Sequence, residues 1–253
     1  MGQNTTLPMI SRPLIGLAFA LAANFVVLGS ASSEEQHIEP KAVVELFTSQ
    51  GCASCPPADA LLTALAERDD VVALAFHVDY WDYVGWKDTF AQEAYSDRQR
   101  AYAKSWGSSR IYTPQIVVNG AKAVVGSRRN EVQQAVDRAS LPLAMDLTLS
   151  GDMLKISVPP KADFSDAVVW LVTYMNRADV KIDSGDNAGK SMVYTQVVTG
   201  RQVLGMWESE TGAELKLPLG EVLGAANTGI AIVVQQERGG LPGAILAAGA
   251  YEP

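Results

Sequence analysis

The sequence predicts an α/β domain followed by a mainly antiparallel β-sandwich domain, preceded by an export signal. Three observations lead to this prediction. An uncharged apolar run stands near the N-terminus, strand and helix signals then alternate up to about residue 140, and after that apolar residues recur at every second position. We therefore expect a signal peptide at 1–31, an α/β domain at 32–140 and a β-rich sandwich domain at 141–253.

The first 31 residues have the features of a secretory signal. Arg12 precedes an apolar run from Leu14 to Leu28, and small residues follow as far as Ala31. This run is interrupted by Asn24 and is shorter than the roughly 18 residues expected of a membrane-spanning helix. We expect cleavage after Ala31, export to the periplasm or the medium, and no transmembrane span in the mature chain. Retention of the segment as an uncleaved anchor is the alternative.

The charge of the chain argues against a nucleic-acid partner. Removal of residues 1–31 takes away Arg12 and no acid, so the 20 basic residues become 19, the 28 acidic residues remain, and the formal charge changes from −8 to −9. Nucleic-acid binding requires clustered Lys and Arg side chains, and Arg128 and Arg129 form the main cluster here. We expect no nucleic-acid partner, and the sequence does not indicate an oligomeric state.

The first domain should contain strands and helices in the order β-α-β-α-β-β-α. Apolar, β-prone runs alternate with segments in which apolar residues recur at helical spacing. The turn Asn119-Gly120 should join the last two strands in a hairpin. The expected strands are 43–48, 71–76, 116–118 and 124–125, and the expected helices begin after Cys55, near residue 90 and near residue 132.

The second domain should consist of antiparallel strands. From Leu143 to Leu149 apolar residues alternate with polar or small ones, and the turn Ser150-Gly151-Asp152 separates this run from another at 154–158. Successive strands without clear helix signals predict a sandwich. Further β-rich runs follow at 167–175, 192–199 and 230–236.

Cys52 and Cys55 are the only cysteines, and they form a Cys-x-x-Cys motif between a predicted buried strand and a helix. A disulfide that closes so short a loop contributes only about 2 kcal/mol, which makes stabilisation alone a weak reason for the motif. Free N–H groups at a helix start favour a thiolate. We therefore predict that Cys52 is an accessible attacking nucleophile and that Cys55 is the resolving thiol.

Thr113 and Pro114 stand immediately before the predicted strand at 116–118. Together with the strand at 43–48 and the cysteine pair, they resemble the thioredoxin superfamily, in which the corresponding proline is cis and flanks the active-site disulfide. The resemblance implies a catalytic position for Pro114 and contact with an incoming substrate for Thr113.

Four segments carry a closer resemblance: 44–52, 55–59, 77–82 and 185–190. They are similar to a bacterial exported family catalogued as domain of unknown function 1223, which has a thioredoxin-like domain followed by a β-rich domain. The resemblance implies the same two-domain fold here. Gly185–Lys190 is also typical of a tight turn, and contact of this turn with the first domain is the alternative.

Three further side chains are candidates to support the thiolate or to transfer protons. Thioredoxin has a buried acid six positions before its first cysteine, where this chain has Leu46. Glu45 is the neighbouring acid, but strand alternation would point it to the opposite face. His77 and Asp79 follow a predicted buried strand, at the sheet edge where open α/β sheets gather ligands. The alternative for each is an ordinary, satisfied side chain.

Trp81 is a candidate substrate-binding residue. It belongs to an aromatic cluster with Tyr80, Tyr83 and Trp86 close to the predicted sheet edge. Packing in the core or in a lid is the alternative.

The leading functional hypothesis is an exported thiol–disulfide oxidoreductase that acts on a protein or on a small thiol or disulfide, without cofactor or metal. A metal-handling protein, in which both thiolates and His77 bind Cu(I), is the first alternative. A non-catalytic binding protein with a structural disulfide is the second. Close approach of His77 to both sulfurs would favour the metal-handling protein. A buried, unreactive Cys52–Cys55 pair would favour the binding protein. The sequence does not fix the direction of electron flow.

Overall fold

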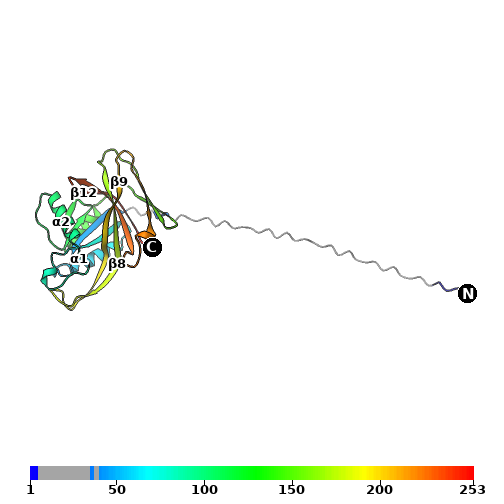
Figure 1. The fold of residues 1–253 in the computed structure, drawn as a ribbon, viewed down its shortest axis with the longest axis horizontal. Helices are drawn as coiled ribbons and strands as arrows, with labels where there is room; N and C mark the ends of the chain where they lie inside the picture. Colours follow the sequence, from blue (N-terminus) through cyan, green and yellow to red (C-terminus); the bar gives the residue numbers. More distant parts are fainter. Residues whose placement is uncertain (5–34, 37–39) are drawn as a thin grey trace. The chain divides into compact units, whose positions relative to one another are not determined.

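The computed structural model describes residues 1–4, 35–36 and 40–253, and the described residues from 35 onwards belong to one compact unit. The signal peptide expected at 1–31 lies outside the described residues, apart from 1–4. The described chain is mostly sheet with few helices (Figure 1). In this part of the chain no helix has the length and apolar character needed to cross a membrane.

A mixed eight-stranded sheet with the order β12-β11-β8-β9-β3-β2-β4-β5 forms the centre of the unit. β2 and β3 are parallel, β4 and β5 continue the sheet as a hairpin, and β3 pairs in parallel with β9. The strands are β2 (Ala42–Thr48), β3 (Val71–His77), β4 (Gln115–Val118), β5 (Lys122–Val125), β8 (Ala167–Lys181), β9 (Ser191–Trp207), β11 (Gly229–Arg238) and β12 (Leu241–Tyr251).

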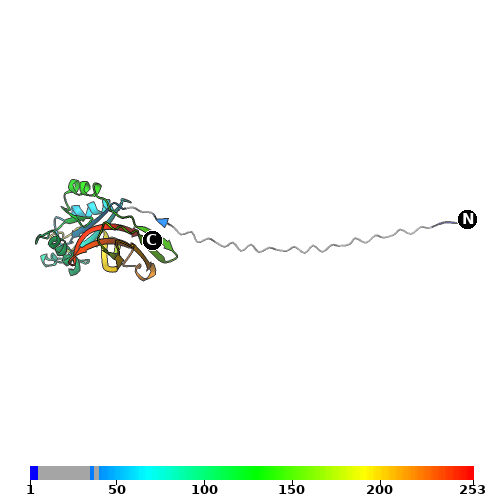
Figure 2. The same ribbon diagram turned by 90° about the horizontal axis from the view of Figure 1, so that it is seen from above.

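Helices cover both faces of the part of this sheet that contains β2 and β3. α1 (Pro56–Ala66) and α3 (Arg129–Asp137) lie on one face, and α2 (Glu93–Ser105) lies on the other (Figure 2). Alternation along β2 explains the two layers, because Val44 packs with α1 while Phe47 packs with α2. Both faces of β2 and β3 are therefore buried, as expected of parallel strands between helices.

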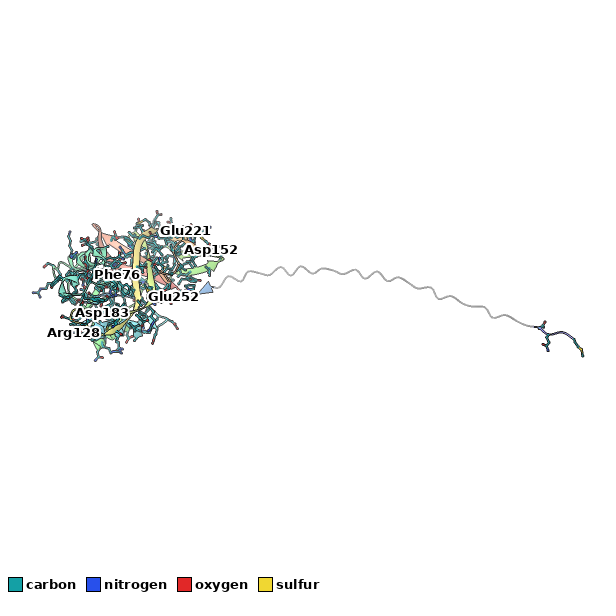
Figure 3. The ribbon with its side chains drawn as sticks, turned by 60° about the horizontal axis from the view of Figure 1, so that its bottom comes forward. Phe76, Arg128, Asp152, Asp183, Glu221 and Glu252 are labelled. Atoms are coloured by element: carbon teal, nitrogen blue, oxygen red, sulfur yellow. A yellow bond between two sulfur atoms is a disulfide. The ribbon has the colours of Figure 1, made fainter. Side chains whose placement is uncertain are left out.

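A four-stranded antiparallel sheet with the order β1-β6-β7-β10 packs against the distal strands of the large sheet. Its strands are β1 (Glu35–Gln36), β6 (Asp146–Ser150), β7 (Met153–Val158) and β10 (Ala213–Pro218). Ile156 and Leu154 of β7 share one core with Leu171 of β8. Asp152 and Glu221 mark this end of the unit in Figure 3, and Asp183, in the β8–β9 loop, marks the opposite end.

The large sheet includes strands from both of the predicted domains, a continuity that differs from the predicted separate sheets. The predicted boundary at residue 140 falls between α3 and β6, but β8, β9, β11 and β12 extend the sheet that β2 and β3 begin. The pairing of Ala75 with Val197 joins the two halves. The division into two separate domains therefore stays a prediction.

A buried ion pair ties α2 to the sheet. Arg98 Nη2 lies 2.6 Å from Glu45 Oε1, and the two side chains are 8% and 2% exposed. The Tyr102 hydroxyl donates a 2.5 Å hydrogen bond to the other Glu45 oxygen, and Arg98 also donates to Gln235 Oε1 on β11. Burial raises the pKa of Tyr102, so its hydroxyl keeps its proton and remains a donor. The Glu45 carboxylate is thus satisfied by groups from α2.

We expect Arg98→Ala to lower the free energy of unfolding by about 3–5 kcal/mol, because it leaves the Glu45 carboxylate buried without its cation. Arg100→Ala is the matched control, since Arg100 lies on the same helix and pairs with Asp97 at the surface, where the two side chains are 50% and 63% exposed. Such an exposed pair contributes about 0–1 kcal/mol. Urea unfolding of both variants measures the difference, and equal losses would contradict a structural role for the buried pair.

Candidate functional site

Cys52 and Cys55 form a disulfide at the start of α1. β2 ends at Thr48, and the chain then turns so that the Cys52 N–H donates to Ser49 O (3.1 Å) and the Cys55 N–H donates to Cys52 O (3.2 Å). Cys55 occupies the N-cap position of α1, and Pro56 follows in the first turn, where no N–H donor is needed. The buried strand and the helix start thus place the sulfurs at the carboxyl edge of the sheet.

The prediction that Cys52 is accessible is wrong for the disulfide form, because both cysteines are 0% exposed. The cover comes from segments remote in sequence. A Cβ atom at Gly51 would lie 3.3 Å from Trp81 Cβ, so Trp81 packs directly over the turn. The Asn187 side chain of the β8–β9 loop donates a hydrogen bond to Cys52 O. Ala53 and Ser54, between the cysteines, are the exposed part of the motif.

Thr113 contacts the Cys52 sulfur, and Trp81 contacts Thr113. The Thr113-Pro114 bond is cis, as the resemblance to the thioredoxin superfamily predicts. The Thr113 hydroxyl donates to Cys52 Sγ (3.2 Å) and accepts a hydrogen bond from Trp81 Nε1 (2.7 Å). A Cβ atom at Gly126 would lie 3.1 Å from Pro114 and 3.0 Å from Ala58 of α1, which places Pro114 on the α1 side of the sheet. The Trp81 indole N–H, the Thr113 hydroxyl and the Cys52 sulfur are therefore linked by two consecutive hydrogen bonds.

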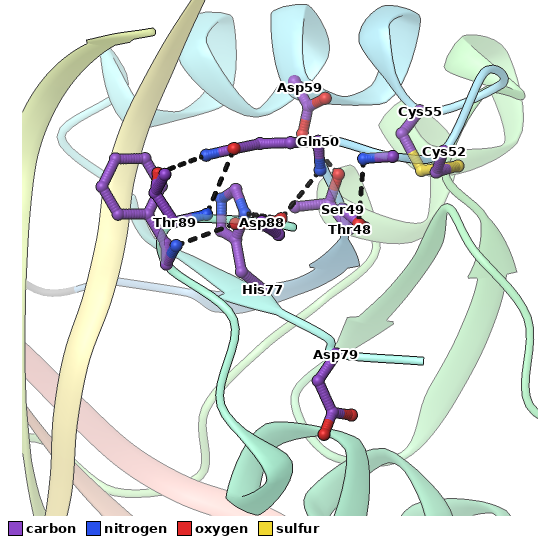
Figure 4. A network of polar contacts seen from close by, with 12 residues as sticks. Thr48, Ser49, Gln50, Cys52, Cys55, Asp59, His77, Asp79, Asp88 and Thr89 are labelled. Carbon is purple, nitrogen blue, oxygen red and sulfur yellow. Dashed lines mark hydrogen bonds and ion pairs between the residues drawn. A yellow bond between two sulfur atoms is a disulfide. The ribbon is translucent and has the colours of Figure 1, made fainter. Parts of the chain in front are cut away.

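A buried polar network lies behind the disulfide (Figure 4). The Gln50 N–H donates to Asp88 Oδ2 (2.8 Å), and His77 Nδ1 lies 2.8 Å from the same oxygen. Phe90 N–H donates to Asp88 Oδ1. Burial alone would raise the pKa of Asp88, but His77 and these backbone donors outweigh it and hold the pKa below its usual value. Asp88 is therefore an ionised carboxylate that fixes the Gln50 backbone.

Asp59 is a second buried acid in this region, with the opposite behaviour. It lies one turn after Cys55 on α1, and its backbone N–H donates to Cys55 O (3.1 Å). Thr48 donates one hydrogen bond to Oδ1 (2.7 Å), while Oδ2 has no partner within the described chain. Burial raises the pKa of Asp59 to about 7. His77 Nε2 is also buried without a partner among the described residues. Asp59 can therefore exchange a proton near neutral pH.

None of the three predicted support residues hydrogen-bonds to a sulfur, since His77 pairs with Asp88 and the other two lie on the α2 side. Glu45 points to the α2 face, as strand alternation suggested, and pairs with Arg98. Asp79 accepts a 2.5 Å hydrogen bond from Ser96 of α2 and stands apart from the sulfurs in Figure 4. The chain leaves β3 at His77 and turns towards α2, which carries Asp79 away.

The geometry that would favour a metal-handling protein is not found in the described chain. There, no group of three or more His, Cys, Asp and Glu side chains is arranged to hold a metal ion. His77 directs Nδ1 to Asp88 rather than to a sulfur.

Sequence reasoning missed Asp59, Asp88 and Asn187. Asp59 follows Cys55 by four residues and shares a helical stripe with Leu62, so an acid on an otherwise apolar face was the available signal. Asn187 belongs to the Gly185–Lys190 segment, for which contact with the first half was one of two alternatives. Its hydrogen bonds to the carbonyls of Gln50 and Cys52 show that this contact exists.

Comparison with known proteins agrees with the resemblance seen in the sequence. The profile of a family described as a protein of unknown function (DUF1223) matches residues 43–235. A crystal structure of an Agrobacterium tumefaciens protein from a structural genomics consortium is 34% identical, with a TM-score of 0.75 over 85% of this chain and 95% of that chain. No curated protein matches. Because the profile spans most of the chain and includes the disulfide, the chain belongs to the DUF1223 family.

Proposed function

We propose that this protein is an exported thiol–disulfide oxidoreductase, which acts in the periplasm or medium on a protein or on a small thiol or disulfide. One observation carries the proposal: the Cys52–Cys55 disulfide lies at the N-terminus of α1, with the Thr113 hydroxyl 3.2 Å from Cys52 Sγ. A crosslink that served stability alone would need no hydrogen-bond donor at its sulfur. A donor there favours the thiolate that exchange requires.

In this proposal residues 40–140 act as a thioredoxin-like unit. The order β2-α1-β3-α2-β4-β5-α3, with β2 and β3 parallel and β4 antiparallel, supports that assignment. The β-rich half acts as a sandwich-like support that extends the sheet and delivers the β8–β9 loop to the disulfide.

The proposed reaction begins with the Cys52 thiolate, which attacks one sulfur of a partner disulfide. A bond forms between Cys52 and that sulfur, and the second partner sulfur leaves as a thiolate. The Cys55 thiol then gives its proton to Asp59 and attacks Cys52 Sγ. The mixed disulfide breaks, the partner leaves as a second thiolate, and the Cys52–Cys55 bond forms again. In reverse, the same groups oxidise a partner dithiol.

Three groups support these steps. The α1 N-terminus and the Thr113 hydroxyl, itself oriented by Trp81, stabilise negative charge on Cys52. We assign the Cys55 proton to Asp59 because Asp59 lies one turn after Cys55 on α1, its Oδ2 has no partner within the described chain, and burial raises its pKa to about 7. It supplies the buried acid for which position 46 has a leucine.

A binding protein with a structural disulfide is the second candidate, and the complete burial of both cysteines favours it. Trapping of partners by the cysteine variants separates the two functions.

We expect Cys55→Ser to accumulate mixed disulfides with partners in the exported fraction, because Cys52 remains without its resolving thiol. Cys52→Ser is the matched control and should trap almost nothing. Non-reducing gels with mass spectrometry of the trapped bands measure the difference and identify the substrate. Absence of trapped partners in both variants would favour the binding protein.

Thr113→Val should slow alkylation of reduced Cys52 at pH 7 by about tenfold, since a hydrogen bond to a charged group is worth about 1.5–3 kcal/mol. Ser54→Ala is the comparison for a weaker contact, because Ser54 Oγ also lies within hydrogen-bond distance of the same sulfur, at 3.5 Å and on the exposed side. We expect this variant to change the rate much less. Rate constants from iodoacetamide labelling and mass spectrometry test this, and an unchanged rate in Thr113→Val would remove the hydroxyl from the mechanism.

Asp59→Asn should slow resolution of a Cys52–glutathione mixed disulfide by about 100-fold at pH 8, where wild-type Asp59 is ionised and acts as a base. Wild-type resolution should accelerate as the pH rises through about 7. Rapid quenching with an alkylating agent measures resolution, with Asp69→Asn, an exposed loop residue, as the control. Equal rates in Asp59→Asn and wild type would refute the assignment.

The same substitution has a consequence for stability. Because the folded pKa of Asp59 exceeds the unfolded one, the unfolded chain binds fewer protons at this group between about pH 4 and 7, so the contribution of Asp59 to wild-type stability should fall across that range. Urea unfolding of the wild type and of Asp59→Asn should therefore give free energies whose difference changes with pH over this range. The same pH profile in both proteins would show that burial does not raise the pKa of Asp59.

A further inference from the structure

The loop between β8 and β9, residues 182–190, reaches the disulfide with a conformation fixed by its own backbone. The Ile182 N–H donates to Lys190 O (3.0 Å), and the Gly189 N–H donates to Ile182 O (2.8 Å). Ile182 is buried and anchors the loop. The loop is therefore ordered without help from the cysteines, and it presents Asn187 to them.

Asn187 is 1% exposed, and both polar atoms of its side chain make hydrogen bonds. Nδ2 donates to Gln50 O (2.9 Å) and to Cys52 O (3.1 Å), and Oδ1 accepts from Lys190 Nζ (2.7 Å). If the amide were turned over, its oxygen would face two carbonyl oxygens and its NH₂ group would face an ammonium group. Lys190 thus keeps the two donors directed at the Cys52 turn.

The Cys52 turn is also held from its other side. The Gln50 N–H donates to Asp88, and the Gln50 side chain accepts from Trp86 Nε1 (2.8 Å). Ser184 of the loop donates to Gly85 O (2.6 Å), which joins the loop to the segment that packs over Gly51. The turn is therefore clamped between the loop and residues 81–89.

Thiol exchange requires a thiolate to approach a disulfide sulfur, and both cysteines are 0% exposed. The turn or the residues that cover it must therefore shift before a partner can react, and the two Asn187 hydrogen bonds oppose a shift of the turn. We propose that Asn187 is a positioning residue for Cys52, which holds the turn in its shielded position and sets the rate at which thiols reach the disulfide. The proposal rests on the proposed function and assigns a role to the Gly185–Lys190 segment.

The test is the second-order rate constant for reduction of the folded disulfide by glutathione, read by alkylation and mass spectrometry. Asn187→Leu keeps the approximate size and removes both donors, so we expect reduction roughly tenfold faster than in the wild type. Lys190→Met keeps Asn187 but removes the ammonium group that fixes the orientation of its amide, so the rate constant for reduction should increase by less than tenfold. Asn176→Leu, on β8 with its side chain bonded to Glu252, is the matched control and should react at the wild-type rate.

Thermal unfolding of each variant separates access from global stability. A folded Asn187→Leu that is reduced at the wild-type rate, or more slowly, would overturn the proposal. If Asn187→Leu does not fold, Lys190→Met decides in the same way. If glutathione reduces the wild-type disulfide and neither variant is reduced faster, the role of Asn187 is refuted and the proposed function stands. If no thiol reduces the disulfide of the folded wild-type protein, both the proposed function and the role of Asn187 are refuted.

Discussion

The parallel pairing of β3 with β9 is the contact on which the candidate site depends. It joins Ala75, in the middle of the first half, to Val197 of the second half. On the helical side, the hydroxyls of Thr63 in α1 and Thr195 in β9 lie 2.9 Å apart and reinforce the junction. Because β8 and β9 form one long hairpin, fixing β9 beside β3 also fixes the loop that carries Asn187. The contact of Asn187 with the Cys52 turn is therefore a consequence of sheet topology.

The number of hydrogen-bond donors distinguishes the two buried acids behind the disulfide. Asp88 receives backbone N–H groups from Gln50 and Phe90 and lies against His77, which stabilises its carboxylate. Asp59 receives one hydroxyl from Thr48 and is otherwise desolvated, so its neutral form persists up to about pH 7. Nearby acids in such different environments can take different roles. Asp88 holds the Gln50 backbone in place, and Asp59 is the acid that exchanges a proton in the proposed reaction.

The parts of the fold set by local signals could be predicted from the sequence. The buried strand before Cys52, the prolines that begin α1 and the positive φ of Asn119 in the β4–β5 turn all act within a few residues. Alternation along β2 also placed Glu45 on the correct face. These features depend on backbone sterics and side-chain period, which a short window of sequence contains.

The pairing of β3 with β9 could not be predicted, because strands more than 100 residues apart leave no shared local pattern. β9 also has a mixed burial pattern and register shifts against β8, which hide its role in the large sheet. The hydrogen bond from Asn187 to Cys52 O joins residues 135 positions apart, and the raised pKa of Asp59 depends on tertiary burial. Both properties arise only when distant segments meet.

The equilibrium reduction potential of the Cys52–Cys55 pair tests the central claim most directly. Folded protein would be equilibrated in glutathione or dithiothreitol buffers, quenched by alkylation and analysed by mass spectrometry. An exchange-active pair should titrate reversibly as a two-electron couple between about −270 and −120 mV, the range of known thiol–disulfide exchange proteins. A potential below about −300 mV, typical of structural disulfides in secreted proteins, would contradict the account.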